Sequence, residues 1–218
     1  MQTVIVNSQK GGSGKSALCR VLAVEASRAG QSVYIIDFDH DGHTLTNWHE
    51  KRDSEEPRRV ELPIEGLGQG LKLLQQQGAD LVLIDTPPNS IHDMTGIFPL
   101  ADLVLVPIKP TPDDLQAAAV TVAGIKSLRL PFLFVITQAI QNTNITAQAI
   151  AALSHHGPVA ETMLVNRVVY PAAFTDGRTP QEIDPRGQAA REVGKLWLNI
   201  KSCLHANMQR IDREVVNG

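Results

Sequence analysis

Residues 9–16, with the sequence QKGGSGKS, constrain this chain more than any other feature. They follow an apolar run at residues 3–6, which is typical of a buried strand, and they precede residues 17–28, which favour a helix. A strand, a glycine-rich turn and a helix in this order form a cradle whose backbone N–H groups can bind phosphate oxygens. We therefore expect this segment to hold the phosphates of a nucleotide.

The side chains of this cradle have separate predicted tasks. Lys15 is placed to reach the β- and γ-phosphates, and the Ser16 hydroxyl is placed to bind Mg²⁺. The segment departs from the general pattern G-x-x-x-x-G-K-S/T, because Gln9 replaces the first glycine and an additional lysine, Lys10, precedes the glycine pair. The residues expected to contact the nucleotide are Gly11, Gly12, Ser13, Gly14, Lys15, Ser16 and Ala17.

Two further apolar runs end in carboxylates. One ends at Asp37, with Asp39 two positions later, and the other ends at Asp85. Open α/β sheets bind ligands at the carboxyl ends of their parallel strands, and Asp85 is expected to hold the Mg²⁺ shell opposite Ser16. Asp37 and Asp39 point the same way in an extended chain, which suits a Mg²⁺-bound water and an attacking water.

Apolar runs and amphipathic segments alternate along the chain. This alternation predicts an α/β fold with a doubly wound, mainly parallel sheet and helices on both faces, in one domain spanning residues 1–218. The expected strands are residues 3–6, 32–37, 59–62, 81–85, 102–107, 131–137 and 158–163. The expected helices are residues 17–28, 44–56, 67–77, 112–127 and 144–153, with a final one from 187 to beyond 210.

Composition limits the classes of partner. The net charge is −3, so the chain as a whole is not a basic coat for nucleic acid. Residues 1–166 carry 12 basic and 17 acidic residues, whereas residues 167–218 carry 8 and 6, a bias compatible with weak phosphate-backbone contact. No apolar run approaches the roughly 20 residues that span a bilayer, and the first residues enter a strand at once, so a cytoplasmic location is expected.

Other kinds of site are less well supported by the residue types present. Cys19 and Cys203 are too few for a disulfide framework or a cysteine-rich metal site. His40, His43 and His49 leave a transition-metal site open, although a phosphate-binding site of this kind prefers Mg²⁺ and oxygen ligands. The alternative is that these histidines lie on an exposed loop.

Several motifs together resemble the ParA/MinD superfamily of ATPases. Residues 10–16 are similar to its deviant Walker A motif, K-G-G-x-G-K-S/T, and residues 83–88 are similar to its Walker B segment. Asp37, Asp39, Gly42, Trp48 and Arg52 resemble the pattern D-x-D-P-Q-G…W…R, and residues 101–115 and 170–182 resemble two later blocks. The resemblance covers nearly the whole chain, whose small size is like that of short plasmid-partition ATPases. The chain departs from the pattern where His40-Asp41 replaces Pro-Gln and where Gln138 replaces a frequent Asn.

The resemblance implies a P-loop NTPase fold with ATP and Mg²⁺ as cofactors. It implies an ATP-dependent homodimer in which Lys10 reaches the partner's phosphates, as an arginine finger does in other phosphoryl-transfer enzymes. A contact of Lys10 with its own nucleotide, or a solvated Lys10, is the open alternative. The catalytic residues are then Lys10, Lys15 and Asp39, with Asp39 orienting the attacking water, and the Mg²⁺ shell comprises Ser16, Asp37 and Asp85.

The function implied by the resemblance is that of a slow partition ATPase, cytoplasmic and nucleoid-associated. Its ATP-bound dimer would bind DNA without sequence preference, and a separate ParB-like, DNA-bound adaptor would stimulate hydrolysis. Arg191, Lys195 and Lys201 are candidate DNA contacts. A MinD-like, membrane-associated positioning ATPase is the alternative, but Asp212 and Glu214 weaken the basic amphipathic tip that it needs, and stable membrane insertion is not expected. A metabolic or metal-transfer enzyme on the same fold is a third possibility.

Overall fold

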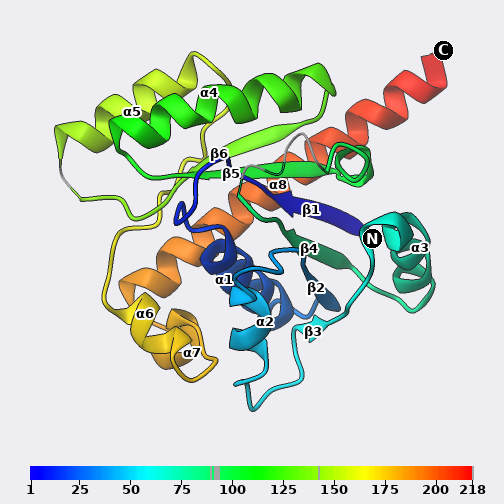
Figure 1. Ribbon diagram of the computed structural model, residues 1–218, viewed down its shortest axis with the longest axis horizontal. Coiled ribbons are helices and arrows are strands. Elements are labelled where there is room, and N and C mark those ends of the chain that lie inside the picture. The colour runs from blue at the N-terminus through cyan, green and yellow to red at the C-terminus, as the bar shows by residue number, and fades with distance from the viewer. Residues whose placement is uncertain (89, 91–93, 142, 218) are drawn as a thin grey trace.

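A single six-stranded parallel sheet forms the centre of the molecule, in the strand order β3-β2-β4-β1-β5-β6 (Figure 1). The structure is a computed structural model that describes residues 1–88, 90, 94–141 and 143–217, with side chains described as far as residue 209. The strands are β1 (Gln2–Val6), β2 (Val33–Asp37), β3 (Arg58–Arg59), β4 (Leu81–Asp85), β5 (Leu103–Ile108) and β6 (Phe132–Ile136).

The central strands are apolar along nearly their whole length because helices cover both faces of the sheet. In β1, Val4, Ile5 and Val6 are fully buried, and their side chains alternate between the two cores. β1 pairs with β4 on one side and with β5 on the other, so its carboxyl end lies in the middle of the ligand-binding edge of the sheet.

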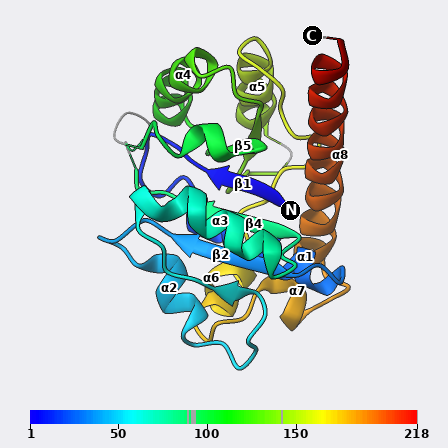
Figure 2. The same cartoon turned by 90° about the vertical axis from the view of Figure 1, so that its right-hand side faces the viewer.

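The helices form one layer on each face. The first layer packs against a core that includes Val4 and Val6, and α8 runs along one flank of the molecule in Figure 2. It contains α1 (Lys15–Arg28), α2 (Thr44–His49), α6 (Val169–Phe174), α7 (Pro180–Ile183) and α8 (Gln188–Asn217). The second layer contains α3 (Leu67–Gln76), α4 (Pro112–Ser127) and α5 (Asn144–Ser154), with the short 3₁₀ helices η1 (Ile64–Gly66) and η2 (Phe98–Leu100) nearby.

The predicted fold class is therefore confirmed, and α4 has the predicted bounds. Thr111 precedes Pro112 and accepts a hydrogen bond from the Asp114 backbone N–H at 3.3 Å, as a helix N-cap does. The short polar helix expected over residues 44–56 is present but begins at Thr44 and ends at His49, so its predicted extent is wrong. The strand expected over residues 59–62 is likewise reduced to the two residues of β3.

The strand expected over residues 158–163 is also wrong. Val159 forms only an isolated bridge with Phe134, and Glu161 donates its backbone N–H to the Asn199 side chain of α8 instead of to a strand. The segment nevertheless runs beside β6, since the Ala160 and Leu164 N–H groups donate to the Phe134 and Ile136 carbonyls at 2.8 and 2.9 Å. Within the described residues, no helix combines the length and the apolar character needed to cross a membrane. The side chains of the tip, including Asp212 and Glu214, lie outside the described residues.

Candidate functional site

The loop between β1 and α1 has a backbone that only glycine adopts easily. Gly12 and Gly14 have φ angles of +72° and +97°, in the left-handed region. A Cβ atom on Gly14 would also lie 3.4 Å from the Thr137 side chain. Gly14 is the N-cap of α1 and has no side-chain capping bond, so the first N–H groups of α1 remain available to an anion.

Side chains that follow β1 and β6 along the chain hold this loop in place. The Thr137 hydroxyl donates to the Ser13 carbonyl at 2.6 Å, and Gln138 Nε2 donates to the Gly12 carbonyl at 3.0 Å. The hydroxyls of Ser8 and Ser13 are 2.5 Å apart. These bonds occupy carbonyl oxygens and leave backbone N–H groups for phosphate. No sequence pattern points to Thr137 as part of the site, and Gln138 stands out in the sequence only as a departure from the family pattern.

Lys15 and Asp85 form a buried pair of charged groups beside the loop, with exposed fractions of 6% and 0%. Neither carboxylate oxygen of Asp85 has a hydrogen-bond partner among the described residues. Burial raises the pKa of Asp85 to about 7, against the opposing effects of the Ser16 hydroxyl and Lys15. Burial also lowers the pKa of Lys15, which Asp85 and Asp39 oppose. Buried polar atoms without partners are costly, and oxygen ligands suit Mg²⁺, so Ser16 and Asp85 fit a magnesium ion.

Asp37 lies directly opposite Asp85 in the sheet, yet its surroundings differ. Asp37 Oδ1 accepts the Asp39 backbone N–H at 3.0 Å, and its Oδ2 accepts both the N–H and the hydroxyl of Thr46 at 2.9 Å. Asp37 thereby anchors the first turn of α2. Asp39 is half-buried and accepts one long bond, 3.4 Å, from the Gly42 N–H. The metal role of Asp37 and the water-orienting role of Asp39 remain predictions.

Lys10 is paired within its own chain. Its ammonium lies 3.2 Å from Asp114 Oδ2 and 3.7 Å from Asp113 Oδ2, at the start of α4. Asp114 is buried and also accepts the Thr111 hydroxyl at 2.5 Å, so the acceptor is well fixed. The structure thus brings Lys10 to the edge of the cradle, whereas its contact with a partner's phosphates remains a prediction.

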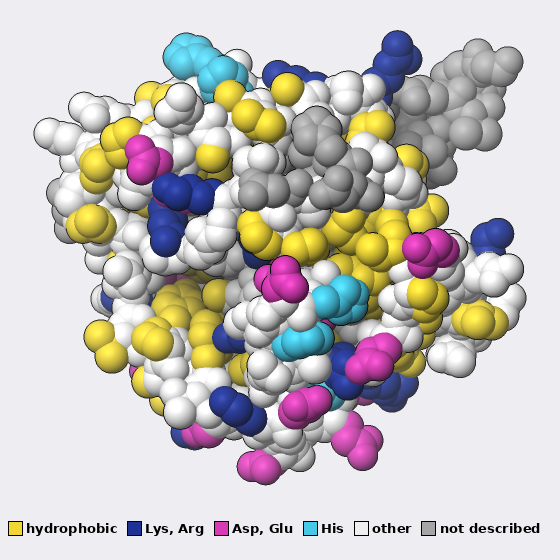
Figure 3. All heavy atoms as spheres, viewed as in Figure 1, with side chains coloured by type: hydrophobic (Ala, Val, Ile, Leu, Met, Phe, Trp, Pro, Cys, Tyr) yellow, Lys and Arg dark blue, Asp and Glu magenta, His cyan; other side chains and the backbone are white. Residues whose placement is uncertain are grey.

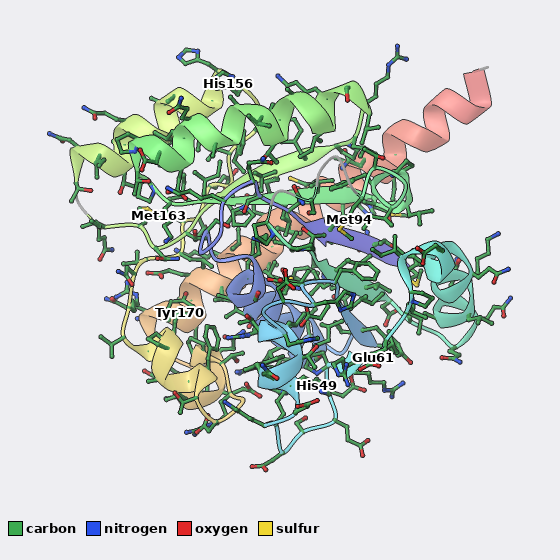
Figure 4. All side chains as sticks on the ribbon, viewed as in Figure 1. His49, Glu61, Met94, His156, Met163 and Tyr170 are labelled. Atoms are coloured by element: carbon green, nitrogen blue, oxygen red, sulfur yellow. The ribbon has the colours of Figure 1, made fainter. Side chains whose placement is uncertain are left out.

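A cavity of about 300 Å³ opens beside the start of α1, on the face that Figure 3 shows hollowed and lined with apolar side chains. Its walls include Tyr170, Pro171 and Phe174 of α6, together with Gln138 and Asn166. Figure 4 labels Tyr170 where α6 meets the rest of this layer. Aromatic and apolar side chains with a few amide groups form walls that suit a nucleotide base next to a phosphate cradle. The sequence analysis noted Tyr170 only within a family block and missed this cavity; the aromatic pair four residues apart was the available signal.

The histidines following β2 do not form a metal centre in the part of the chain that the structure describes. That part contains no group of three or more His, Cys, Asp or Glu side chains arranged to hold a metal ion. His40 and His43 are exposed at a cavity of about 570 Å³ that Glu61 also lines, while the His49 ring is 2.8 Å from the Pro57 carbonyl. Figure 4 shows His49 and Glu61 on this side of the molecule. The exposed-loop interpretation fits His40 and His43.

The family model described as "CobQ/CobB/MinD/ParA nucleotide binding domain" matches residues 4–180. The Maintenance of carboxysome distribution protein A of Halothiobacillus neapolitanus is 26% identical over 211 residues, which cover 90% of this chain and 94% of the relative. Protein ParA of Rhizobium radiobacter is 26% identical over 189 residues, covering 81% and 84%.

Among solved structures, the septum site-determining protein MinD complexed with Mg-ADP, from Pyrococcus horikoshii OT3, superposes with a TM-score of 0.75. The match has 15% identity and covers 94% of this chain and 98% of that one, so it supports the fold. The expected superfamily is confirmed by the family model, which spans well over half of the chain. The chain belongs to the CobQ/CobB/MinD/ParA family of nucleotide-binding domains.

Proposed function

We propose that this protein is a ParA-type ATPase that dimerises on ATP, binds DNA without sequence preference and acts in partition or in the positioning of a cargo. The observation that carries the proposal is the buried Lys15–Asp85 pair beside a glycine-rich loop, with two carboxylate oxygens left without partners. A magnesium nucleotide supplies the charges that this arrangement lacks.

The residues divide the work of hydrolysis between them. Bound Mg²⁺ neutralises negative charge on the phosphates. Ser16, Asp37 and Asp85 would hold the ion, while Lys15 and the backbone N–H groups of the loop would bind and orient the phosphates. Asp39 holds the attacking water. Slow intrinsic hydrolysis would keep the dimer in its ATP-bound state until an adaptor stimulates hydrolysis.

Lys10 links hydrolysis to dimerisation in this proposal. Within one chain its ammonium is held 3.2 Å from Asp114 Oδ2. In the ATP-bound dimer Lys10 exchanges this carboxylate for phosphate oxygens of the partner's nucleotide, where a positive charge stabilises the transition state. Hydrolysis is therefore fast only when a dimer has formed, because only then does Lys10 reach the reacting phosphates.

DNA binding is assigned to exposed basic side chains on α8. Arg191, Lys195 and Lys201 are all exposed there, and such contacts with phosphates are independent of sequence and weaken with salt. A ParB-like, DNA-bound adaptor then stimulates hydrolysis and releases the dimer from nucleoid DNA. The names of the two relatives, one for carboxysome distribution and one for ParA, support a cargo that is either a protein body or a replicon.

The decisive experiment measures binding to a nonspecific DNA duplex with ATP, with ADP and without nucleotide, at low and at physiological salt. Binding should require ATP and should weaken steeply with salt. Lys15→Ala should abolish it, whereas Lys72→Ala, which removes an exposed lysine on α3, should leave it unchanged. Equal affinity in all three nucleotide states would contradict the switch. Binding to anionic lipid vesicles instead of DNA would favour the MinD-like alternative.

A second experiment tests the water-orienting residue. Asp39→Ala should bind ATP and dimerise but hydrolyse ATP poorly, because only the attacking water loses its partner. Normal hydrolysis by this variant would show that another group orients the water.

A further inference from the structure

Arg20 is a buried arginine of α1 that touches two other elements of its layer. It is 7% exposed, and its guanidinium carbon lies 4.6 Å from the centroid of the Phe174 ring of α6 and 5.8 Å from that of Trp48 of α2. Its Nη2 donates a hydrogen bond to the Thr44 carbonyl, at the first residue of α2. Figure 1 shows α1, α2 and α6 on the same side of the sheet.

The two contacts of Arg20 lead to different parts of the candidate site. Phe174 is a wall of the cavity assigned to the nucleotide base. Thr44 follows directly after the loop of residues 38–43, which carries Asp39. The Arg20 guanidinium therefore contacts Phe174, a wall of the cavity for the nucleotide base. It also contacts Thr44, at the end of the loop that carries the water-orienting Asp39.

The start of α2 is held by backbone bonds, including one from the His43 N–H to the Asp39 carbonyl at 2.8 Å, and by side chains of other elements. Its N-cap is His43, which has a φ of 45° and forms no side-chain capping bond. The bonds from Thr46 to Asp37 and the bond from Arg20 to the Thr44 carbonyl hold this first turn. A change at Arg20 thus removes one of the side-chain bonds that hold the turn next to the Asp39 loop.

The chemistry of arginine suits a link of this kind. Burial lowers the pKa of Arg20 to about 10, so the group stays charged at neutral pH. Its planar guanidinium can stack on a ring while donating in its own plane. Nε of Arg20 has no partner among the described residues, so the site does not satisfy the group fully. A core selected for stability alone would favour an apolar side chain here.

We propose that Arg20 is a positioning residue that transmits occupancy of the base cavity to the Asp39 loop. A base seated against Phe174 fixes the ring, the ring fixes the guanidinium, and the guanidinium fixes the Thr44 carbonyl at the end of the loop. The inference rests on the proposed ATPase function and deepens it. It makes the turnover rate, and not only the affinity, depend on the presence of the base.

The test compares ATP with ribose 5′-triphosphate, which has the same phosphates and sugar but no base. Arg20→Met retains an unbranched apolar stem and removes the guanidinium. At saturating substrate it should lower turnover of ATP by about tenfold, as small misplacements of catalytic groups do, and turnover of ribose 5′-triphosphate by less than about twofold. Dissociation constants for ATP should change by less than about threefold.

The matched control is Arg28→Met. Arg28 lies on the same helix and also donates to a backbone carbonyl, that of Gln181, but it is exposed and distant from the loop. This variant should hydrolyse both substrates at the wild-type rates. An Arg20→Met variant that loses both activities equally, or neither, overturns the inference.

Hydrogen exchange provides a readout that needs no turnover. In the wild type, ATP should protect backbone amides of residues 39–47 more than ribose 5′-triphosphate does, and Arg20→Met should abolish this difference. Phe174→Leu removes the ring from the other end and should act in the same direction, with no added effect in the double variant. If Arg20→Met does not fold, Phe174→Leu decides the question alone.

The outcomes separate this inference from the proposed function. A wild-type chain that binds ATP without hydrolysing it contradicts the ATPase function, while the exchange experiment still judges Arg20. A wild-type chain that hydrolyses ATP and ribose 5′-triphosphate at the same saturated rate retains the ATPase function but overturns the role of Arg20. A chain that binds no ATP overturns both.

Discussion

Two groups of charged side chains, one buried and one partly buried, differ in how far the chain itself supplies their hydrogen-bond partners. In the Arg52 cluster (Arg52, Gly177, Thr179 and Glu182), Arg52 bonds to the Gly177 carbonyl at 2.7 Å and to Glu182 at 2.8 Å. Thr179 donates its N–H and hydroxyl to the other oxygen of Glu182, both at 2.8 Å. In the phosphate-loop cluster (Lys15 and Asp85), both carboxylate oxygens have no partner among the described residues.

The difference separates structural from functional charge. The Arg52 guanidinium also lies 4.7 Å from the Trp48 ring centroid, and Trp48 donates to the Arg178 carbonyl, so this cluster joins the end of α2 to α7. Every carboxylate and guanidinium atom of Arg52 and Glu182 except Arg52 Nε has a partner within the chain, and removing Arg52 would leave the half-buried charge of Glu182 behind. The phosphate-loop cluster is left to be completed by a ligand. Arg52 and Asp85 both belong to motifs of the family pattern, but Arg52 stabilises the fold whereas Asp85 is available to a ligand.

The largest expected effect is on the Arg52 cluster. Arg52→Met should lower the free energy of unfolding by about 2–3 kcal/mol, less than for a fully buried pair, because the Glu182 carboxylate that loses its partner is 25% exposed. Urea unfolding measures the change. Arg58→Met, which breaks an exposed ion pair with Glu56, should change stability far less. Similar losses for Arg52→Met and Arg58→Met would remove the structural role given to the Arg52 cluster.

Asp85→Asn should have the converse effect. It should lower Mg²⁺-dependent ATP hydrolysis by about 100-fold or more, because the metal loses its anionic ligand. It should change the free energy of unfolding without nucleotide far less than Arg52→Met does, because the burial cost of the charge that it removes offsets the lost attraction to Lys15. Asp80→Asn, an exposed carboxylate just before the same strand, is the control. Strong destabilisation by Asp85→Asn would show that the Asp85 carboxylate stabilises the fold as Arg52 does, and would contradict the distinction between the two clusters.

Asp37 combines features of the two clusters, because it accepts hydrogen bonds from α2 and is also proposed to help hold Mg²⁺. Asp37→Ala should lower the free energy of unfolding by about 1–2 kcal/mol, the usual loss when a helix end loses its capping side chain. Thermal and urea unfolding without nucleotide measure this structural part separately from any effect on hydrolysis. An unchanged stability would show that the bonds from Thr46 contribute nothing.

The smallest effect expected is a pH dependence of stability from Glu182. Burial alone would raise the pKa of this carboxyl, but hydrogen bonds from Arg52 and Thr179 outweigh it and lower the pKa. The unfolded chain therefore binds this proton more readily, so the stabilisation is present above pH about 4.5 and is lost as the pH falls through the folded-state pKa. Urea unfolding between pH 5.5 and 3.5 should show a shallower fall for Glu182→Gln than for the wild type. Parallel curves would exclude this linkage.

Local patterns in the sequence were enough to predict the layers and the phosphate loop. Apolar runs locate β1, β2, β4 and β5, and Thr111 with Pro112 predicts the start of α4. What could not be predicted depends on contacts between distant residues. The Arg52–Glu182 bond joins residues 130 apart, and the Lys10–Asp114 pair joins residues 104 apart.

The same limit applies to the uses of individual carboxylates. Asp37 and Asp85 both end apolar strands and look equivalent in sequence. Only the position of Thr46 shows that Asp37 is engaged by α2 while Asp85 is not. The base cavity needs α6 beside the start of α1, which no local pattern specifies.

The measurement that most directly tests the central claim is calorimetric titration of ATP into the protein, with Mg²⁺ and with the metal chelated. We expect Mg²⁺ to strengthen ATP binding by the wild type and not by Asp85→Asn, and we expect Lys15→Ala to bind ATP under neither condition. Equal ATP affinity with and without Mg²⁺ in the wild type, or full affinity in Lys15→Ala, would contradict the assignment of this cluster as a magnesium-nucleotide site.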